Sequence, residues 1–247
     1  MKIALVTGAS RGIGRATALL LAQQGYAVGV NYVNNETAAQ SVIDKIHQAG
    51  GKAIALKADI ADEAQVVAMF KQLSAELGPI TALVNNAGIL FQQTTIENLS
   101  AERINKVLST NVTGYFLCCR EAVKIMSHRH GGKGGAIVNV SSAASRLGAP
   151  GEYVDYAASK GAVDTLTTGL ALEVAAYGIR VNCVRPGLIY TEMHASGGEP
   201  GRVDRVKANL PMQRGGQPEE VAQAISWLLS DSASYATGSF LELAGGR

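Results

Sequence analysis

Apolar runs alternate with stretches of helical periodicity along the whole chain. Some apolar runs, such as residues 82–84, lack a polar alternate, which indicates strands buried on both faces. Such strands belong to a parallel sheet between two layers of helices, so the pattern predicts an α/β fold. The expected strands are residues 3–7, 27–32, 53–58, 82–86, 136–141, 180–185 and 239–243. The expected helices are residues 13–24, 36–49, 63–77, 101 to about 128, 156–177 and 219–229.

One domain is expected, because no linker, composition shift or internal repeat divides residues 1–247. Residues 191–214 differ from their surroundings. They contain Gly197, Gly198, Pro200 and Pro211 around a short polar helical stretch. This composition is typical of a mobile lid or an insertion, and we expect a substrate lid here.

Composition and charge argue against several classes of function for this protein. The net charge of +2 gives no sign of a nucleic-acid or membrane surface. No signal segment precedes the first strand and no apolar run is long enough to cross a membrane, so a cytoplasmic protein is expected. The odd number of cysteines (three) favours buried thiols over a disulfide framework. The four histidines are scattered without acidic or cysteine partners, and no metal site is expected.

The first strand is followed by a glycine-rich turn, residues 7–14, which opens a helix. Glycines in this position allow a tight turn and let backbone N–H groups approach a pyrophosphate at the helix N-terminus. The turn lacks the Gly-Lys-Ser/Thr of a P-loop. Its strand–turn–helix context therefore predicts dinucleotide binding.

The end of the second strand bears on the choice between NAD and NADP. A carboxylate there would bind the ribose 2′-OH of NAD. This strand ends with Asn31 and Tyr32, and no acid follows until Glu36. Arg11 in the glycine turn could face a 2′-phosphate, for which a guanidinium is well suited. NADP is the preferred prediction, with NAD as the alternative and a solvated loop cation as the alternative role for Arg11.

Tyr156 and Lys160 lie four residues apart in a helical stretch and would share one face of that helix. A free tyrosine has a pKa near 10 and is a poor acid or base at neutral pH. A fixed cation nearby would lower that pKa and make the phenol a usable general acid/base.

Taken in order, these features resemble the short-chain dehydrogenase/reductase family over essentially the full length. The resemblance rests on residues 7–14, Asp59, residues 85–88, Asn111, Ser142, Tyr156 with Lys160, Pro186-Gly187 and Thr191. It implies a single doubly wound Rossmann-like domain with a seven-stranded parallel sheet. It also implies hydride transfer between NAD(P) and a small or medium carbonyl or alcohol.

The same resemblance implies roles for four catalytic residues. Tyr156 would exchange a proton with the substrate oxygen, and Lys160 would lower the Tyr156 pKa and bind the nicotinamide ribose. Ser142 would hydrogen-bond the substrate oxygen, and Asn111 would hold a water in a proton relay. The residues expected at the cofactor are Gly8, Ser10, Arg11, Gly12, Ile13, Gly14, Asn31, Tyr32, Asp59, Ile60, Asn86, Ala87, Gly88, Tyr156, Lys160, Pro186, Gly187, Ile189 and Thr191.

Alternatives remain open at two of these positions. The segment between Ser142 and Tyr156 is one residue longer than in many relatives, so Ser141 is a rival for the Ser142 role. Asp59 could accept from an adenine amino group or cap the next helix.

The substrate also remains open. A 3-oxoacyl-[acyl-carrier-protein] reductase would use the basic loop 127–133 for docking, although residues 176–178 lack the charge expected of that branch. A sugar 1-dehydrogenase is a further alternative. A non-catalytic dinucleotide sensor would be expected to lack one of the four catalytic residues, all of which are present. Family members commonly form homotetramers or homodimers, and the apolar helical regions 103–126 and 163–176 suit such contacts.

Overall fold

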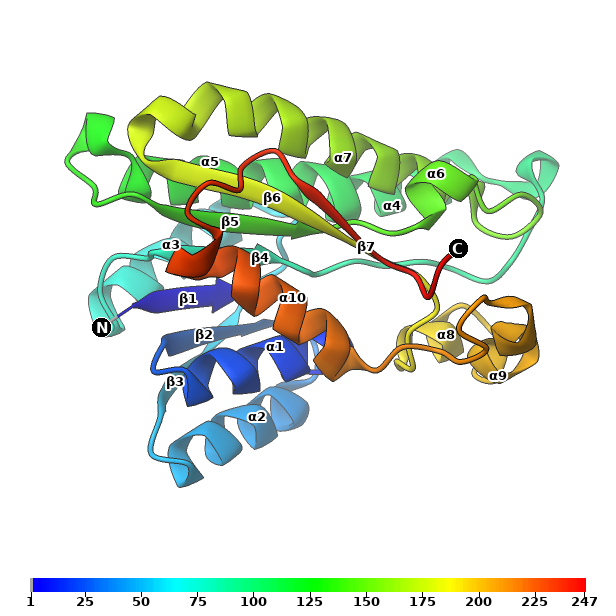
Figure 1. Cartoon of the computed structure of the whole chain (residues 1–247), viewed down its shortest axis with the longest axis horizontal. Coiled ribbons are helices and arrows are strands. Elements are labelled where there is room, and N and C mark those ends of the chain that lie inside the picture. Colours follow the sequence, from blue (N-terminus) through cyan, green and yellow to red (C-terminus); the bar gives the residue numbers. More distant parts are fainter. Residues whose placement is uncertain (1) are drawn as a thin grey trace.

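The computed structural model describes residues 2–247 and contains a seven-stranded sheet in which every pairing is parallel (Figure 1). Every residue of the strands β1, β2 and β4 is buried, as expected for strands covered on both faces. The predicted strands are confirmed. They are β1 (Ile3–Val6), β2 (Ala27–Tyr32), β3 (Lys52–Lys57), β4 (Ala82–Asn85), β5 (Gly135–Val140), β6 (Ile179–Pro186) and β7 (Phe240–Leu243).

The strand order in the sheet is β3-β2-β1-β4-β5-β6-β7. The chain builds outward from β1 in one direction, then returns to the centre and builds outward in the other. Ala4 of β1 lies opposite both Val28 of β2 and Ala82 of β4. Ligands of such sheets bind at the carboxyl ends of the strands, where the order reverses. This is the predicted doubly wound, Rossmann-like arrangement, and it places a crevice above β1 and β4.

Helices cover both faces of the sheet (Figure 1). One core cluster joins the sheet to α1, α2 and α10, and a second cluster on the other face joins it to α3, α5 and α7. The α-helices are α1 (Gly12–Gln23), α2 (Glu36–Gln48), α3 (Glu63–Glu76), α4 (Ala101–Leu108), α5 (Gly114–Met126), α6 (Ala144–Leu147), α7 (Val154–Val174), α8 (Met193–Ser196), α9 (Arg202–Val206) and α10 (Pro218–Leu229). Short 3₁₀ turns are η1 (Ile96–Asn98), η3 (His128–His130), η4 (Ala175–Tyr177), η5 (Lys207–Asn209) and η6 (Asp231–Ala233).

Side chains fix the starts of three of these helices. Asn35, Asp62 and Ser100 each accept a hydrogen bond from a backbone N–H in the first turn of α2, α3 and α4. Each such cap stabilises its helix by about 1 kcal/mol. The residue that caps α3 is therefore Asp62 and not Asp59, which was considered for that role.

The long helix expected over residues 101 to about 128 is interrupted. Between α4 and α5 the backbone forms a π-helical turn, η2 (Ser109–Thr113), and α5 ends at Met126. Such turns insert an extra residue into a helix and are frequent at functional sites. The catalytic candidate Asn111 lies within this turn.

The segment 191–214 contains the short helices α8 and α9 followed by η5, beyond the carboxyl ends of the strands (Figure 1). It is irregular, as its glycines and prolines predict. Within residues 2–247, no helix combines the length and apolar character needed to span a membrane.

Candidate active site

Tyr156 and Lys160 occupy the first turns of α7, and their side chains lie close together. The Lys160 ammonium nitrogen is 5.6 Å from the centroid of the Tyr156 ring. It donates hydrogen bonds of 2.8 Å to the Val140 carbonyl oxygen and 3.3 Å to the Tyr115 hydroxyl. Only 2% of Lys160 is exposed. The lysine is thus held between α7, α5 and the end of β5.

Burial controls the protonation of both groups. It raises the pKa of Tyr156 to about 12, and a hydrogen bond with Ser142 opposes this shift. Burial lowers the pKa of Lys160 to about 8. Lys160 directs its hydrogen bonds to Val140 and Tyr115, and the lowering of the Tyr156 pKa by its charge stays a prediction. In this arrangement Tyr156 is a protonated phenol at neutral pH.

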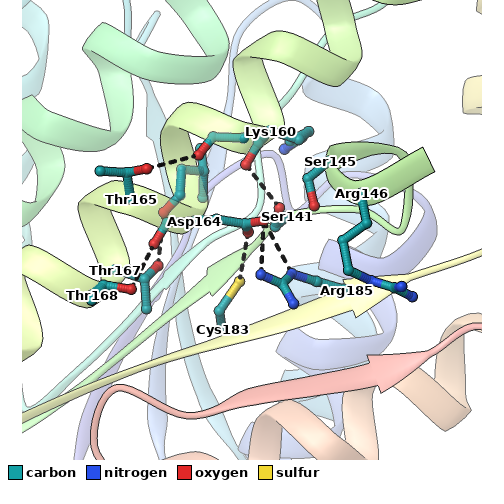
Figure 2. Close-up of polar contacts among 12 residues, drawn as sticks. Ser141, Ser145, Arg146, Lys160, Asp164, Thr165, Thr167, Thr168, Cys183 and Arg185 are labelled. Carbon is teal, nitrogen blue, oxygen red and sulfur yellow. Dashed lines mark hydrogen bonds and ion pairs between the residues drawn. The ribbon is translucent and has the colours of Figure 1, made fainter. Parts of the chain in front are cut away.

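The two candidate serines follow β5 and have different surroundings. Ser141 is buried and donates from Oγ to the Lys160 carbonyl oxygen at 3.1 Å (Figure 2). Ser142 lines the cavity described below and hydrogen-bonds Tyr156. Its Oγ also accepts from the Ala144 backbone N–H at 3.1 Å. Ser142 is thus open to the cavity, whereas the Ser141 hydroxyl is bonded to the backbone of α7.

An ion pair fastens α7 to β6 one turn beyond Lys160 (Figure 2). The Arg185 guanidinium lies 2.9 Å from a carboxylate oxygen of Asp164, which follows Lys160 by four residues. The Cys183 thiol lies 3.8 Å from the other carboxylate oxygen. This ion pair therefore holds the part of α7 that follows Lys160 against the sheet.

A second ion pair fixes the start of α7 and was missed by sequence reasoning. Arg103 of α4 donates from Nε to an Asp155 carboxylate oxygen at 2.7 Å, and only 2% of the Asp155 side chain is exposed. Asp155 also accepts from the Tyr156 backbone N–H at 2.9 Å. The one signal for this ion pair in the sequence is the acid directly before Tyr156. Its partner Arg103 lies 52 residues away in the chain, so the pair could not be read from local pattern.

Asn111 is fully buried and uses its amide within the protein. Its Oδ1 accepts from the Ile89 N–H at 2.8 Å, and its Nδ2 donates to the Ile89 carbonyl at 2.9 Å. The same nitrogen donates to Ser159 Oγ at 3.1 Å. Asn111 thereby ties the loop after β4 to α7. Its role in a water relay stays a prediction.

The glycine turn has the shape that a pyrophosphate cradle needs. Gly8 and Gly12 have positive φ angles of 61° and 53°. A β-carbon on Gly14 would lie 2.4 Å from the Gly8 carbonyl oxygen, and one on Gly8 would lie 2.9 Å from the Ala87 Cα. The first turn of α1 has no acidic residue and no side-chain cap. Its N–H groups therefore remain suited to an anion, and the turn fits a dinucleotide.

The end of β4 supports this cradle from below. The Asn86 side chain donates to the carbonyls of Thr7 and Gly8 at 2.8 and 3.1 Å. The Thr7 hydroxyl accepts from the backbone N–H groups of Asn86 and Ala87. Gly88 faces the catalytic side, since a β-carbon there would lie 3.6 Å from the Lys160 nitrogen.

The side chains of Asn31, Tyr32 and Ile60, which are expected to contact the cofactor, are buried in this structure. Asn31 accepts from the Gly8 N–H at 3.1 Å and donates to two carbonyls of the β3 region. Ile60 packs against α5, where a β-carbon on Gly114 would lie 2.7 Å from it. These side chains pack around the cradle, and their contact with the cofactor stays a prediction. Asp59 is partly exposed and accepts from the Ala61 N–H at 3.0 Å.

Arg11 is exposed at the start of α1, beside the segment 191–214. Its guanidinium lies 3.4 Å from the Ser196 hydroxyl of α8. Arg15, one turn along α1, lies 3.9 Å from the Glu192 carboxylate. The glycine turn and the beginning of this segment are therefore neighbours. Within the turn, Ser10 is half-buried and lies between buried Ala9 and exposed Arg11.

A cavity of about 350 Å³ joins the cradle to the catalytic candidates. Ile13 and Asn86 border its cofactor side. The predicted nicotinamide contacts Pro186, Gly187, Ile189 and Thr191 all line it. Ser142, Tyr156 and Lys160 line it as well. A buried tyrosine and a turn suited to a dinucleotide, both bordering one cavity, are an arrangement that fits a hydride-transferring oxidoreductase.

Metal ligands are not assembled here. Across residues 2–247, no group of three or more His, Cys, Asp or Glu side chains is placed to hold a metal ion.

Comparisons with known proteins agree with this class. The profile of the family described as "Enoyl-(Acyl carrier protein) reductase" matches residues 8–247. An uncharacterized oxidoreductase of Escherichia coli K12 is 78% identical over 247 residues, covering all of both chains. A 3-oxoacyl-[acyl-carrier-protein] reductase of Synechocystis is 41% identical, covering 99% of this chain and 96% of that protein.

Solved structures give the same result. A short-chain type dehydrogenase/reductase from Mycobacterium marinum superimposes with a TM-score of 0.93 at 36% identity, covering 99% of this chain and 94% of the other. A short chain dehydrogenase from Burkholderia cenocepacia in complex with NADP gives a TM-score of 0.90 at 32% identity, covering 99% and 97%. The chain belongs to the short-chain dehydrogenase/reductase family, and it is an NAD(P)-dependent oxidoreductase.

Proposed function

We propose that this enzyme prefers NADP and interconverts a small or medium carbonyl compound and its alcohol, with Tyr156 as the general acid/base. One observation carries the proposal. Tyr156, Ser142 and Ile13 of the glycine turn border one cavity, together with Asn86, which supports that turn. A substrate oxygen beside Tyr156 would therefore lie next to a dinucleotide bound in the cradle.

The bound nicotinamide would supply or accept the hydride. Residues Gly8, Ser10, Arg11, Gly12, Ile13 and Gly14 would hold the phosphates, and Pro186, Gly187, Ile189 and Thr191 would border the nicotinamide. In reduction, Tyr156 would donate its proton to the substrate oxygen, for which a phenol with a raised pKa is in the correct form. Ser142 would orient that oxygen. The buried Lys160 charge, 5.6 Å from the Tyr156 ring centroid, would stabilise the phenolate that forms.

The NADP preference rests on the exposed Arg11 guanidinium and on the lack of a carboxylate at the end of β2. The Burkholderia relative binds NADP, which supports the same choice. Residues 191–214 are proposed as a lid, because they border both the glycine turn and the cavity.

A substrate panel tests the proposal. Purified protein is incubated with NADPH or NADH and a series of ketones, aldehydes and sugars, and consumption of the reduced cofactor is recorded. The Tyr156→Phe protein is the control. Turnover of at least one carbonyl by the natural protein, lost in the control, is expected. Equal turnover by both proteins would exclude Tyr156 as the proton donor.

A second candidate is reduction of a 3-oxoacyl group on a carrier protein, which several relatives at 38–41% identity are named for. The geometry of the basic loop argues against docking at this chain's own cavity. The loop precedes β5, where Arg129 stacks on Tyr177 at 5.5 Å, whereas Ser142 follows β5. The six residues of β5 separate the two ends by about 20 Å. Carrier-bound acetoacetyl substrate belongs in the panel to decide this.

A homotetramer or homodimer is proposed from the outer face of α5 and α7. Leu172 is 80% exposed and Phe116 is 51% exposed on these helices. Gly161 and Gly169 leave open space beside α7, which suits close packing of a second helix. Light scattering after size-exclusion chromatography would give the number of chains, and a monomer would exclude this proposal.

A further inference from the structure

Beyond Tyr156, the cavity extends between the loop before α7 and the proposed lid. Its walls in this part include the apolar side chains of Leu147, Pro150, Met193 and Leu210 and the ring of Tyr153, and the polar residues Glu152, His194, Arg202 and Arg247 also line it. Such walls favour apolar ligands, because water leaves them at little cost. They offer few partners for the several hydroxyl groups of a sugar.

Two polar side chains in this part of the cavity already have partners. The Tyr153 hydroxyl donates to the Gly197 carbonyl at 3.3 Å. The His194 Nε2 lies 2.9 Å from the Ile189 carbonyl oxygen. Burial is the main cause that lowers the pKa of His194, so this ring is neutral near pH 7. Neither side chain supplies a charge to a substrate.

Arg202 is a largely buried cation of this wall, which Arg247 also borders, and Glu152 pairs with Arg202. The two guanidinium NH₂ groups each donate to one Glu152 carboxylate oxygen, Nη1 at 2.9 Å and Nη2 in a shorter contact. The guanidinium also lies 5.2 Å from the centroid of the Tyr153 ring. Only 13% of the Arg202 side chain is exposed. The planar fork that would otherwise bind a carboxylate is filled by a residue of the protein.

Three other hydrogen bonds hold this arrangement. Glu199 accepts from Arg202 at 3.4 Å and from Gln93 at 2.7 Å. The Glu152 carbonyl accepts from the Thr94 N–H at 3.1 Å. Arg202 therefore faces two acids, and the carboxylate of Glu152 is fixed from its backbone side.

We propose that this site takes a neutral, largely apolar ketone or secondary alcohol, and that Glu152 excludes anionic substrates by occupying Arg202. This inference rests on the proposed function. An entering carboxylate would have to displace Glu152 from a well-formed bidentate pair. It would otherwise lie near the negative charge of Glu152, which is unfavourable in a partly dry cavity.

The test compares a neutral β-keto ester with the matching acid, ethyl acetoacetate and acetoacetate. The value of kcat/KM with NADPH is measured for each substrate. The natural protein should favour the ester. Glu152→Gln keeps the shape of the side chain but frees the Arg202 charge, and should shift the acid-to-ester ratio toward the acid by about tenfold or more. Glu152→Gln combined with Arg202→Leu should remove that shift.

Asp204→Asn is the matched control. Asp204 is a lid acid that pairs with Lys207 and Tyr190, and it does not border the cavity. The acid-to-ester ratio of kcat/KM for Asp204→Asn should equal that of the natural protein. Melting curves by circular dichroism show whether each variant is folded.

A binding measurement separates this inference from the proposed function. Calorimetric titration of acetoacetate is done with oxidised NADP, which cannot reduce it. Tighter binding to Glu152→Gln than to the natural protein supports the inference even without turnover. No turnover of any carbonyl by the natural protein would overturn the proposed function. Equal use of acid and ester by the natural protein, or an unchanged ratio and affinity in Glu152→Gln, would overturn the exclusion by Glu152.

Discussion

The Lys160 ammonium lies 5.6 Å from the centroid of the Tyr156 ring and is directed to the end of β5. The helix places the two residues together, as their four-residue spacing predicts. The Val140 carbonyl at the end of β5 then accepts a hydrogen bond from the Lys160 ammonium and so orients it. We therefore expect the lysine to act on the phenol through space, and burial is the main cause that raises the Tyr156 pKa.

Replacing Tyr156 with Phe should reduce kcat for carbonyl reduction at least about a hundredfold, because the proton donor is lost. The dissociation constant of NADPH should change little, since the ring remains. Steady-state kinetics and fluorescence titration measure the two effects. A matched loss of cofactor affinity would indicate a binding role instead.

Replacing Lys160 with Met should abolish turnover yet stabilise the fold by about 2 kcal/mol near pH 7. The folded-state pKa of Lys160 is lowered from 10.5 to about 8, so its protonated form is disfavoured by folding. This cost is complete below about pH 8 and disappears as the pH rises to about 10.5.

The stability difference between the Lys160→Met and natural proteins should therefore shrink across that pH range. Urea denaturation at several pH values measures it. The hydrogen bond from the Tyr115 hydroxyl to Val140 remains in the variant, so no buried carbonyl loses its last partner. A destabilised variant would show that the lysine contributes more through its hydrogen bonds than burial costs.

Replacing Arg11 with Gln should weaken NADPH binding by roughly tenfold and NADH binding much less, because only NADPH carries the 2′-phosphate. Arg15→Gln is the control, since Arg15 lies on the same helix but pairs with Glu192. Dissociation constants from fluorescence titration test this. Equal weakening of both cofactors by Arg11→Gln would remove Arg11 from 2′-phosphate recognition.

Replacing Asn111 with Leu should destabilise the protein by about 2–4 kcal/mol, because the Ile89 N–H and carbonyl lose their partner in a buried site. The control is Asn98→Ala. Asn98 is exposed and its side chain donates to Thr95, so this replacement should change the free energy of unfolding little. Denaturant unfolding gives the free energies. Similar values for both variants would show that the π turn holds without its amide.

Replacing Arg103 with Met should cost about 3 kcal/mol, because the buried Asp155 carboxylate loses its cation. Adding Asp155→Asn should recover part of that loss, because the uncompensated charge is gone. A double-mutant cycle of unfolding free energies measures the coupling. Additive effects would mean that the pair does not position the start of α7 through its charge.

Local pattern was sufficient for the strands and most helices, because each is buried with a regular period. It was insufficient at residues 101 to about 128, where apolar periodicity predicts one helix. The π turn there accompanies hydrogen bonds between Asn111 and Ile89, which are 22 residues apart. No local signal encodes such a contact.

The site shows the same division. The glycine turn and the Tyr156–Lys160 pair depend on neighbours in sequence, and the structure brings them to one cavity. The Asn31 side chain hydrogen-bonds the Gly8 N–H and carbonyl oxygens of the β3 region, contacts that its position at a strand end could not reveal. Glu152 and Arg202 meet across 50 residues and two loops. Their pairing becomes visible only in three dimensions.

The reversal of strand order between β1 and β4 also constrains how the chain folds. Residues near position 4 must find partners near position 82 before the crevice exists. Closing so long a loop costs entropy before any contact offsets it, and folding slows as sequence separation grows. The cofactor crevice is therefore a late product of folding, and partly folded chains would expose the apolar β1 and β4 edges until it forms.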